Sequence, residues 1–264
     1  MGQAVYLKPI EKIAMEYQKE RIKMVKTIVE LTHKSNEGHI PSSLSVLDIM
    51  YSVYDKYVTK DSKHKFVLSK GHASLGLFVV LDHFGILGTD LSSFCEYESL
   101  LGGHPTTKVS SVEASTGSLG HGMPIALGMA MAKKIQKDDG IVFVLIGDGE
   151  ANEGTIWESA LLASHHKLDN LVCFMDHNHS TDRALDMGNV VSKFDSFGWK
   201  THEIDGHDVE SIKSIEPTAG KPTFVLCNTI KGKGVSIMEG NREWHHKTPN
   251  AEQMQSMFAK MESN

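Results

Sequence analysis

The chain has 264 residues, of which 40% are hydrophobic and 23% are charged, and its net charge is −6 at pH 7. An acidic balance gives no reason to expect nucleic-acid binding, which normally requires a basic face. No stretch approaches about 20 consecutive apolar residues, and the N-terminus lacks an apolar signal segment, so we expect neither a membrane span nor secretion. The three cysteines show no CxxC spacing, which fits a reducing compartment and a cytoplasmic protein.

Helical and strand-like hydrophobic patterns alternate along the chain. Helical spacing of apolar residues predicts helices over residues 10–34, 44–57, 123–137 and 155–167, with a further surface helix after Pro249. Continuous apolar runs predict strands buried on both faces at residues 66–68, 140–146, 171–175 and 223–227. Strands that alternate with helices are typical of βαβ units. We therefore predict one α/β domain over residues 1–264, with a parallel β-sheet flanked by helices.

Polar turns follow three of the predicted strands, at residues 69–72, 147–149 and 176–178, and the first two contain glycine. Because the carboxyl ends of parallel strands meet at one edge of a sheet, these turns are expected to lie together there. Gly147 and Gly149 flank Asp148, and glycines let backbone amides approach an anion closely. A hard divalent cation can bridge Asp148 to phosphate oxygens, and Asn178 would supply a neutral oxygen to the same ion.

The residues by themselves leave other interpretations of this turn open. The turn reads GDGEANEG, which lacks the GxGxxG spacing of a dinucleotide site, and no GxxxxGK[ST] motif occurs in the chain. Residues 147–149 are also compatible with a tight turn in which Asp148 caps a helix. The histidines form no HExxH motif and no pairing with cysteine, so their spacing predicts no zinc site.

A series of longer sequence blocks occurs in one order from about residue 20 to residue 247. The blocks are VLSKGHAS at 67–74, GHP at 103–105, TGSLGHG at 116–122, GDG at 147–149 followed by Glu153-Gly154 and Asn178, FGW at 197–199, IDGHD at 204–208 and TIKGKG at 229–234. Together they resemble the N-terminal domain of transketolases. The resemblance implies the thiamine diphosphate-binding fold of the diphosphate-binding type, with thiamine diphosphate held through a divalent cation.

The resemblance also implies a set of cofactor ligands. Asp148 and Asn178 match side-chain ligands of Mg²⁺ or Ca²⁺, and a backbone carbonyl near Ser180 would be the third ligand. The positions that match the rest of the cofactor site are His72, Gly117, Leu119, Gly149, Glu153, Lys231 and His245. Glu153 matches a position at the family's dimer interface, and an exposed glutamate at a helix N-terminus is the alternative interpretation.

Three histidines, His39, His104 and His245, match positions that line the substrate channel of the family. Imidazole can exchange protons near neutral pH with the carbonyl and hydroxyl groups of a sugar during carbon–carbon cleavage. His246 follows His245 at a position where relatives usually carry glycine. His165 and His166 belong to no motif, and we expect them to be surface or packing residues.

Full-length transketolases continue through two further domains, and the second domain supplies the glutamate and the aromatic pocket that receive the aminopyrimidine ring. The resemblance therefore implies the N-terminal subunit of a split transketolase, which transfers a two-carbon ketol unit from a ketose to an aldose. Its substrates would be sugars or sugar phosphates, and it would need a separate C-terminal partner subunit, in a heterotetramer. Two alternatives remain: another thiamine diphosphate enzyme component, of the deoxyxylulose-phosphate synthase or 2-oxo acid dehydrogenase kind, and a non-catalytic cofactor-binding relic.

Overall fold

Five strands form one sheet in the computed structural model, which describes residues 9–181 and 185–263. The strands are β1 (Lys65–Leu68), β2 (Val142–Gly147), β3 (Leu171–His177), β4 (Lys200–Asp205) and β5 (Thr223–Asn228). Their order is β1-β2-β3-β5-β4, and every neighbouring pair is parallel. All the strands therefore end at the same edge of the sheet.

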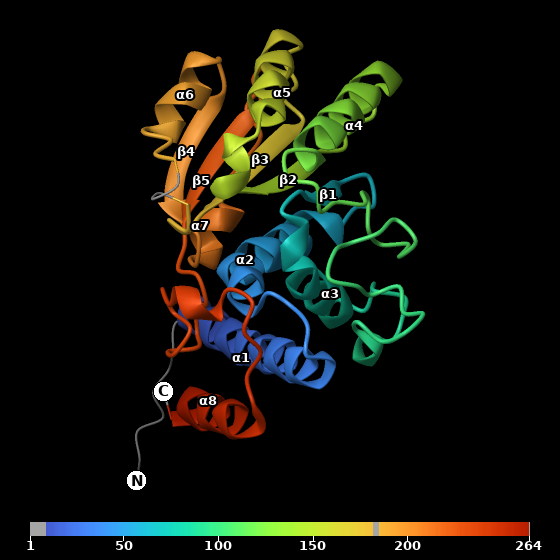
Figure 1. Ribbon diagram of the computed structural model, residues 1–264. Coiled ribbons are helices and arrows are strands. Elements are labelled where there is room, and N and C mark those ends of the chain that lie inside the picture. The colour runs from blue at the N-terminus through green and yellow to red at the C-terminus, as the bar shows by residue number, and fades with distance from the viewer. Residues whose placement is uncertain (1–8, 182–184, 264) are drawn as a thin grey trace.

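Helices cover both faces of the sheet (Figure 1). One face carries α1 (Pro9–Ser35), α2 (Ile40–Val53), α3 (Ser74–His83) and α7 (Val209–Lys213). The other face carries α4 (Gly122–Gln136), α5 (Gly154–His165) and α6 (Val190–Ser196). The last helix, α8 (Ala251–Ser263), packs on α1 through the buried Met257 and Met261. Among the helices of residues 9–181 and 185–263, none has the length and apolar character that a membrane span requires.

The strand sequences divide between two hydrophobic cores. Successive side chains of a strand point to opposite faces of the sheet. In β2, Phe143 and Leu145 belong to the core beneath α1, α2 and α3, whereas Val142 and Val144 belong to the core beneath α4, α5 and α6. Both faces are thus fully buried, which is why the strand reads as an unbroken apolar run.

The elements expected from the hydrophobic pattern are present, although one helix has different bounds and further elements occur beside them. The helix expected over 44–57 begins earlier, at Ile40, with Pro41 in its first turn, and gives way at Tyr54–Val58 to a π-helical turn. The edge strand β4 was not expected, because its sequence KTHEID is mostly polar and half-exposed. The short helices α3, α6 and α7 were likewise not expected.

A buried carboxylate on α2 joins the N-terminal helices to the loop after β5. Asp48 accepts hydrogen bonds from the hydroxyl of Tyr17 and from Nε of Arg21, the latter at 2.7 Å. Its other oxygen lies 2.7 Å from Nδ1 of His207. Nε2 of the same ring accepts the backbone N–H of Ile230 at 2.8 Å, which places the ring proton on Nδ1 as the donor to Asp48.

A second buried carboxylate lies at the carboxyl edge of the sheet. Asp176, near the end of β3, is fully buried and forms an ion pair with Lys70, whose side chain is also buried. It also accepts hydrogen bonds from Oγ of Ser45 at 2.5 Å, from the hydroxyl of Thr229, and from Nδ2 of Asn178 at 2.8 Å. Burial alone would raise the pKa of Asp176, but the Lys70 ammonium and these donors outweigh it and hold the pKa below its usual range.

We expect Asp176→Ala to lower the free energy of unfolding by about 3–5 kcal/mol, because it leaves the Lys70 ammonium buried without a counter-charge. Urea denaturation measures the change. Asp139→Ala is the matched control, since Asp139 pairs with Lys63 on the surface and its loss should leave the midpoint nearly unchanged. Equal shifts in the two variants would contradict the importance assigned to the buried pair.

Candidate functional site

A cavity of about 420 Å³ lies at the carboxyl edge of the sheet. It is lined by residues from turns that are far apart in the sequence. Of the residues assigned from the sequence, it brings together His39, His72, His104, Gly117, Leu119, Asp148, Gly149, Asn178, Ser180, Lys231 and His245. Glu153 is the exception, since it is exposed and lies beside Gly120, outside the cavity lining.

Oxygen ligands converge at one side of the cavity. Asp148 caps the short 3-10 turn that follows β2, and Asn178 follows β3. Oδ2 of Asp148 and Oδ1 of Asn178 both accept the backbone N–H of Ser180, each at 3.1 Å. Since Nδ2 of Asn178 donates to Asp176, its carbonyl oxygen is the atom presented to the cavity. A carboxylate and an amide oxygen this close together are a donor set for a hard divalent cation.

Ser180 directs its N–H toward the side-chain oxygens of Asp148 and Asn178, and its Oγ lies 3.3 Å from Oδ1 of Asp148. These contacts do not involve the carbonyl oxygen, whose role as a metal ligand stays a prediction. Gly149 is needed beside it for steric reasons, because a Cβ at that position would lie 2.6 Å from Thr181. The Gly149 amide donates to Oδ1 of Asp148 at 2.7 Å.

Two lysines supply positive charge. Lys70 is buried beneath Gly147, and Lys231 lies across the cavity with Nζ 2.9 Å from Nδ1 of His245. Burial, together with the charge of Lys70, lowers the pKa of Lys231. An anion in the cavity would be attracted chiefly to Lys231, because Asp176 neutralises the charge of Lys70, and a diphosphate requires such a positive group.

The histidines of the cavity stand close to one another. The ring centroid of His39 lies 5.5 Å from that of His72 and 5.6 Å from that of His245. Burial lowers the pKa of His72 far below its usual value, with a further contribution from Lys70. His104 packs on Gly117, where a Cβ would lie 2.8 Å from the ring. The cavity thus presents imidazoles that can exchange protons with a ligand.

Several residues that line the cavity were given no role from the sequence, among them Lys70, Glu150 and His246. Lys70 lies inside the SKGHA turn, in which only His72 was assigned. Glu150, next to the GDG turn, is buried and accepts N–H groups from Gly120 at 2.8 Å and Gly147 at 3.1 Å, which ties the turn at 116–122 to the end of β2. Burial raises the pKa of Glu150. His246 also lines the cavity. The one feature of the sequence that could have indicated a role for it is that relatives usually carry glycine at this position.

Taken together, these groups fit a divalent cation bound with a diphosphate. Asp148 and Asn178 would offer oxygens to such a cation, and Lys70, Lys231 and His72 also line the cavity. A Cβ at Gly117 would lie 2.8 Å from His104 and one at Gly149 would lie 2.6 Å from Thr181, so both positions favour glycine.

Comparison with known proteins gives the same family. Residues 18–262 match the family model described as the thiamine diphosphate binding domain of transketolase. The chain is 38% identical over 261 residues to one of the subunits of apulose-4-phosphate transketolase from Phocaeicola vulgatus, in an alignment that covers 92% of each chain. It is 31% identical over 279 residues to a 6-deoxy-6-sulfo-D-fructose transketolase subunit of a Clostridium species, covering 96% of this chain and 98% of the relative.

Solved structures agree. Transketolase from Campylobacter jejuni superposes with a TM-score of 0.82 at 28% identity, and the enzyme from Leishmania mexicana with a TM-score of 0.83 at 25% identity. The aligned region covers 94% and 93% of this chain but 43% and 41% of those enzymes, so the chain spans less than half of their length. The chain therefore belongs to the transketolase family, as a transketolase-type transferase subunit that carries the thiamine diphosphate-binding domain.

Proposed function

We propose that this chain is the N-terminal subunit of a two-chain transketolase that moves a two-carbon ketol unit from a ketose to an aldose. The observation that carries the proposal is the cavity itself, in which oxygen donors, lysines and histidines from separate strand ends face one another. A cofactor-binding relic would have no need of the histidines that adjoin the oxygen donors. The proposed location is the cytoplasm, where three free cysteines stay reduced.

Each group in the cavity has a part in this proposal. Asp148 and Asn178 hold Mg²⁺ or Ca²⁺, with Ser180 as a further ligand, and the ion holds the diphosphate. Gly149, His72 and Lys231 bind the diphosphate oxygens, while Gly117 and Leu119 pack against the cofactor. Bound thiamine diphosphate supplies the carbanion and electron sink for carbon–carbon cleavage. The protein's share is to position the cofactor and the sugar.

His39, His104 and His245 are proposed to bind the sugar and to move protons at its carbonyl and hydroxyl oxygens. Neutral imidazole can act as either donor or acceptor, according to which ring nitrogen carries the proton. Burial and the neighbouring histidines lower the pKa of His39 to about 4, so its ring is neutral near pH 7. The names of the related subunits specify a ketose phosphate and a sulfonated ketose. By analogy, we propose sugar or sugar-phosphate substrates here.

The second half of the active site is proposed to come from a separate C-terminal subunit, in a heterotetramer. In the family, that half receives the aminopyrimidine ring. The helices α4 and α5 support the proposal, because they expose large apolar side chains to solvent: Ile125, Ile135, Leu161 and Leu162. Exposed apolar side chains on two helices that contact each other suit a protein interface. Glu153, at the start of α5, would lie near the same interface.

Asp148→Ala should weaken binding of thiamine diphosphate in excess Mg²⁺ by at least about 10-fold, or about 1.4 kcal/mol, because it removes the charged ligand of the ion. Asn178→Ala should have a smaller effect, since the lost ligand is neutral. Calorimetry measures both. Asp186→Ala, which changes an exposed aspartate nearby, is the control. Unchanged affinity in Asp148→Ala would refute the assignment of the metal site.

The histidines should separate into two groups. With the partner present, His39→Ala and His104→Ala should lower turnover by about 100-fold, because they remove proton exchange with the sugar, and leave cofactor binding nearly intact. His72→Ala should instead weaken cofactor binding. Steady-state kinetics and cofactor titrations, with His165→Ala as a surface control, distinguish the two patterns. The reverse pattern would show that the two groups have been exchanged.

The isolated chain should not catalyse ketol transfer, because one subunit provides only the diphosphate and metal side of the cofactor site. The assay combines the chain, thiamine diphosphate and Mg²⁺ with ketose donors and an aldose acceptor, with and without the candidate partner chain. Activity should appear only with the partner and reach a plateau near a one-to-one ratio. Efficient two-carbon transfer by the chain alone would refute the two-chain proposal.

A further inference from the structure

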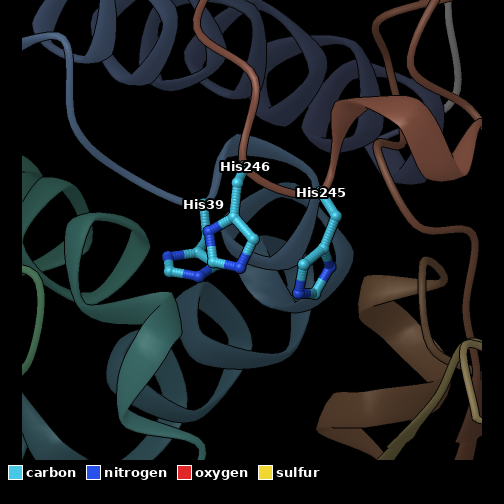
Figure 2. Close-up of side chains that lie close together, drawn as sticks. All are labelled: His39, His245 and His246. Carbon is cyan, nitrogen blue, oxygen red and sulfur yellow. The ribbon is translucent and has the colours of Figure 1, made fainter.

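Three imidazoles form a cluster on the wall of the cavity. His39 directly precedes α2, and His245 and His246 follow the 3-10 turn Arg242–Trp244. Figure 2 shows the three rings turned toward one another. The ring centroid of His246 lies 4.2 Å from that of His39 and 4.5 Å from that of His245. One ring nitrogen from each residue lies within 4.8 Å of those from the other two.

We propose that His39, His245 and His246 bind a transition-metal ion of the Zn²⁺ type, at a site separate from the oxygen ligands of Asp148 and Asn178. Imidazole nitrogens suit Zn²⁺, Ni²⁺ and Co²⁺, whereas Mg²⁺ and Ca²⁺ prefer oxygen. The two sites would therefore select different ions. Three protein ligands leave a fourth tetrahedral position open to water or to a ligand in the cavity.

Only a small adjustment is needed to close the site. Tetrahedral Zn²⁺ with bonds of about 2.0–2.1 Å separates its ligand atoms by about 3.4 Å, so nitrogens that lie within 4.8 Å must approach by at most about 1.4 Å. His245 and His246 are exposed and have room to turn, while the buried Trp244 beside them fixes the backbone. His39 is half-buried and is held at the start of α2.

The protonation state of His39 and His245 also suits a metal. Burial and the adjacent histidines lower the pKa of His39 to about 4, and burial and Lys231 do the same for His245. Both rings are therefore neutral near pH 7. A metal ion would not have to displace a proton bound as imidazolium from either of them.

The positive charge of Lys231 disfavours metal binding at this cluster. Its Nζ lies 2.9 Å from Nδ1 of His245, so its charge repels an incoming cation. Binding of the metal through Nδ1 of that ring requires the ammonium group to turn away. Removal of the charge should consequently strengthen metal binding, an effect opposite to the loss of a ligand.

One consequence rests on the proposed function. His39 and His245 are the same residues that would meet the sugar, so an ion bound to them would occupy the sugar's place. Zn²⁺ would then inhibit the two-chain enzyme in competition with the sugar, while Mg²⁺ stays bound with the diphosphate.

The test titrates Co²⁺, a spectroscopic substitute for Zn²⁺, into the purified chain without cofactor and in excess Mg²⁺. We expect the visible absorption bands of tetrahedral Co²⁺ to saturate at one ion per chain and to disappear when Zn²⁺ is added. His246→Gly should weaken Co²⁺ binding by at least about 10-fold. Loss of a residue that only orients a metal ligand typically lowers metal affinity by that factor, and loss of the ligand itself should lower it no less.

Two further variants make the result specific. Lys231→Met should tighten Co²⁺ binding relative to the unmodified chain. His166→Gly changes another adjacent histidine pair, in which the exposed His165 and His166 rings lie 4.9 Å apart, and should leave the affinity unchanged. Lack of tetrahedral bands in the unmodified chain, or equal affinity in His246→Gly, would overturn the proposal.

The chain alone is sufficient for this measurement, so its outcome does not depend on transketolase activity. If the bands are lacking but the two-chain enzyme is active, the metal site is refuted and the proposed function stands. If the bands appear and the two-chain enzyme is active, the inhibition constant of Zn²⁺ should rise in His246→Gly by the same factor as the dissociation constant of Co²⁺. An inhibition constant that does not follow the dissociation constant would refute the link to the sugar site.

Discussion

The carboxylate of Asp176 is the point on which the site depends. A carboxylate removed from water must have its oxygens satisfied by donors, and here the donors come from four separate segments: Lys70 after β1, Ser45 on α2, Asn178 after β3 and Thr229 after β5. Each segment carries a cavity residue close by. His72 follows β1, Lys231 follows β5, and His39 precedes α2. One buried charge therefore sets the relative positions of groups that are remote in sequence.

The sequence predicts those features that depend on neighbouring residues, and it does not predict those that depend on contacts between distant residues. A strand buried on both faces is an unbroken apolar run, so β2, β3 and β5 were evident, while the polar edge strand β4 was not. Asp148 and Asn178 could be paired in advance because both follow strands of a parallel sheet. The burial of Lys70 could not be predicted, because it depends on Asp176, which lies 106 residues away in the sequence. The contact of His39 with His246 likewise exists only in three dimensions.

The cavity separates two kinds of chemistry by the residues on its walls. On one side, Asp148 and Asn178 present oxygens to hard cations. On the other, burial lowers the pKa of His39 and of His245 to about 4 and so keeps these two rings neutral. Neutral imidazoles limit the positive charge that collects around Lys231 before an anion is bound. Lys231 can thus attract a diphosphate.

The strand order β1-β2-β3-β5-β4 also affects how fast the chain can fold. Parallel neighbours cannot be joined by a tight turn, so each pairing closes a long loop before its contacts form. Chains dominated by such distant contacts fold slowly. The cavity draws on residues from 39 to 246, so it is complete only when nearly all of these loops have closed. A bound cofactor or metal would consequently slow unfolding far more than it would accelerate folding.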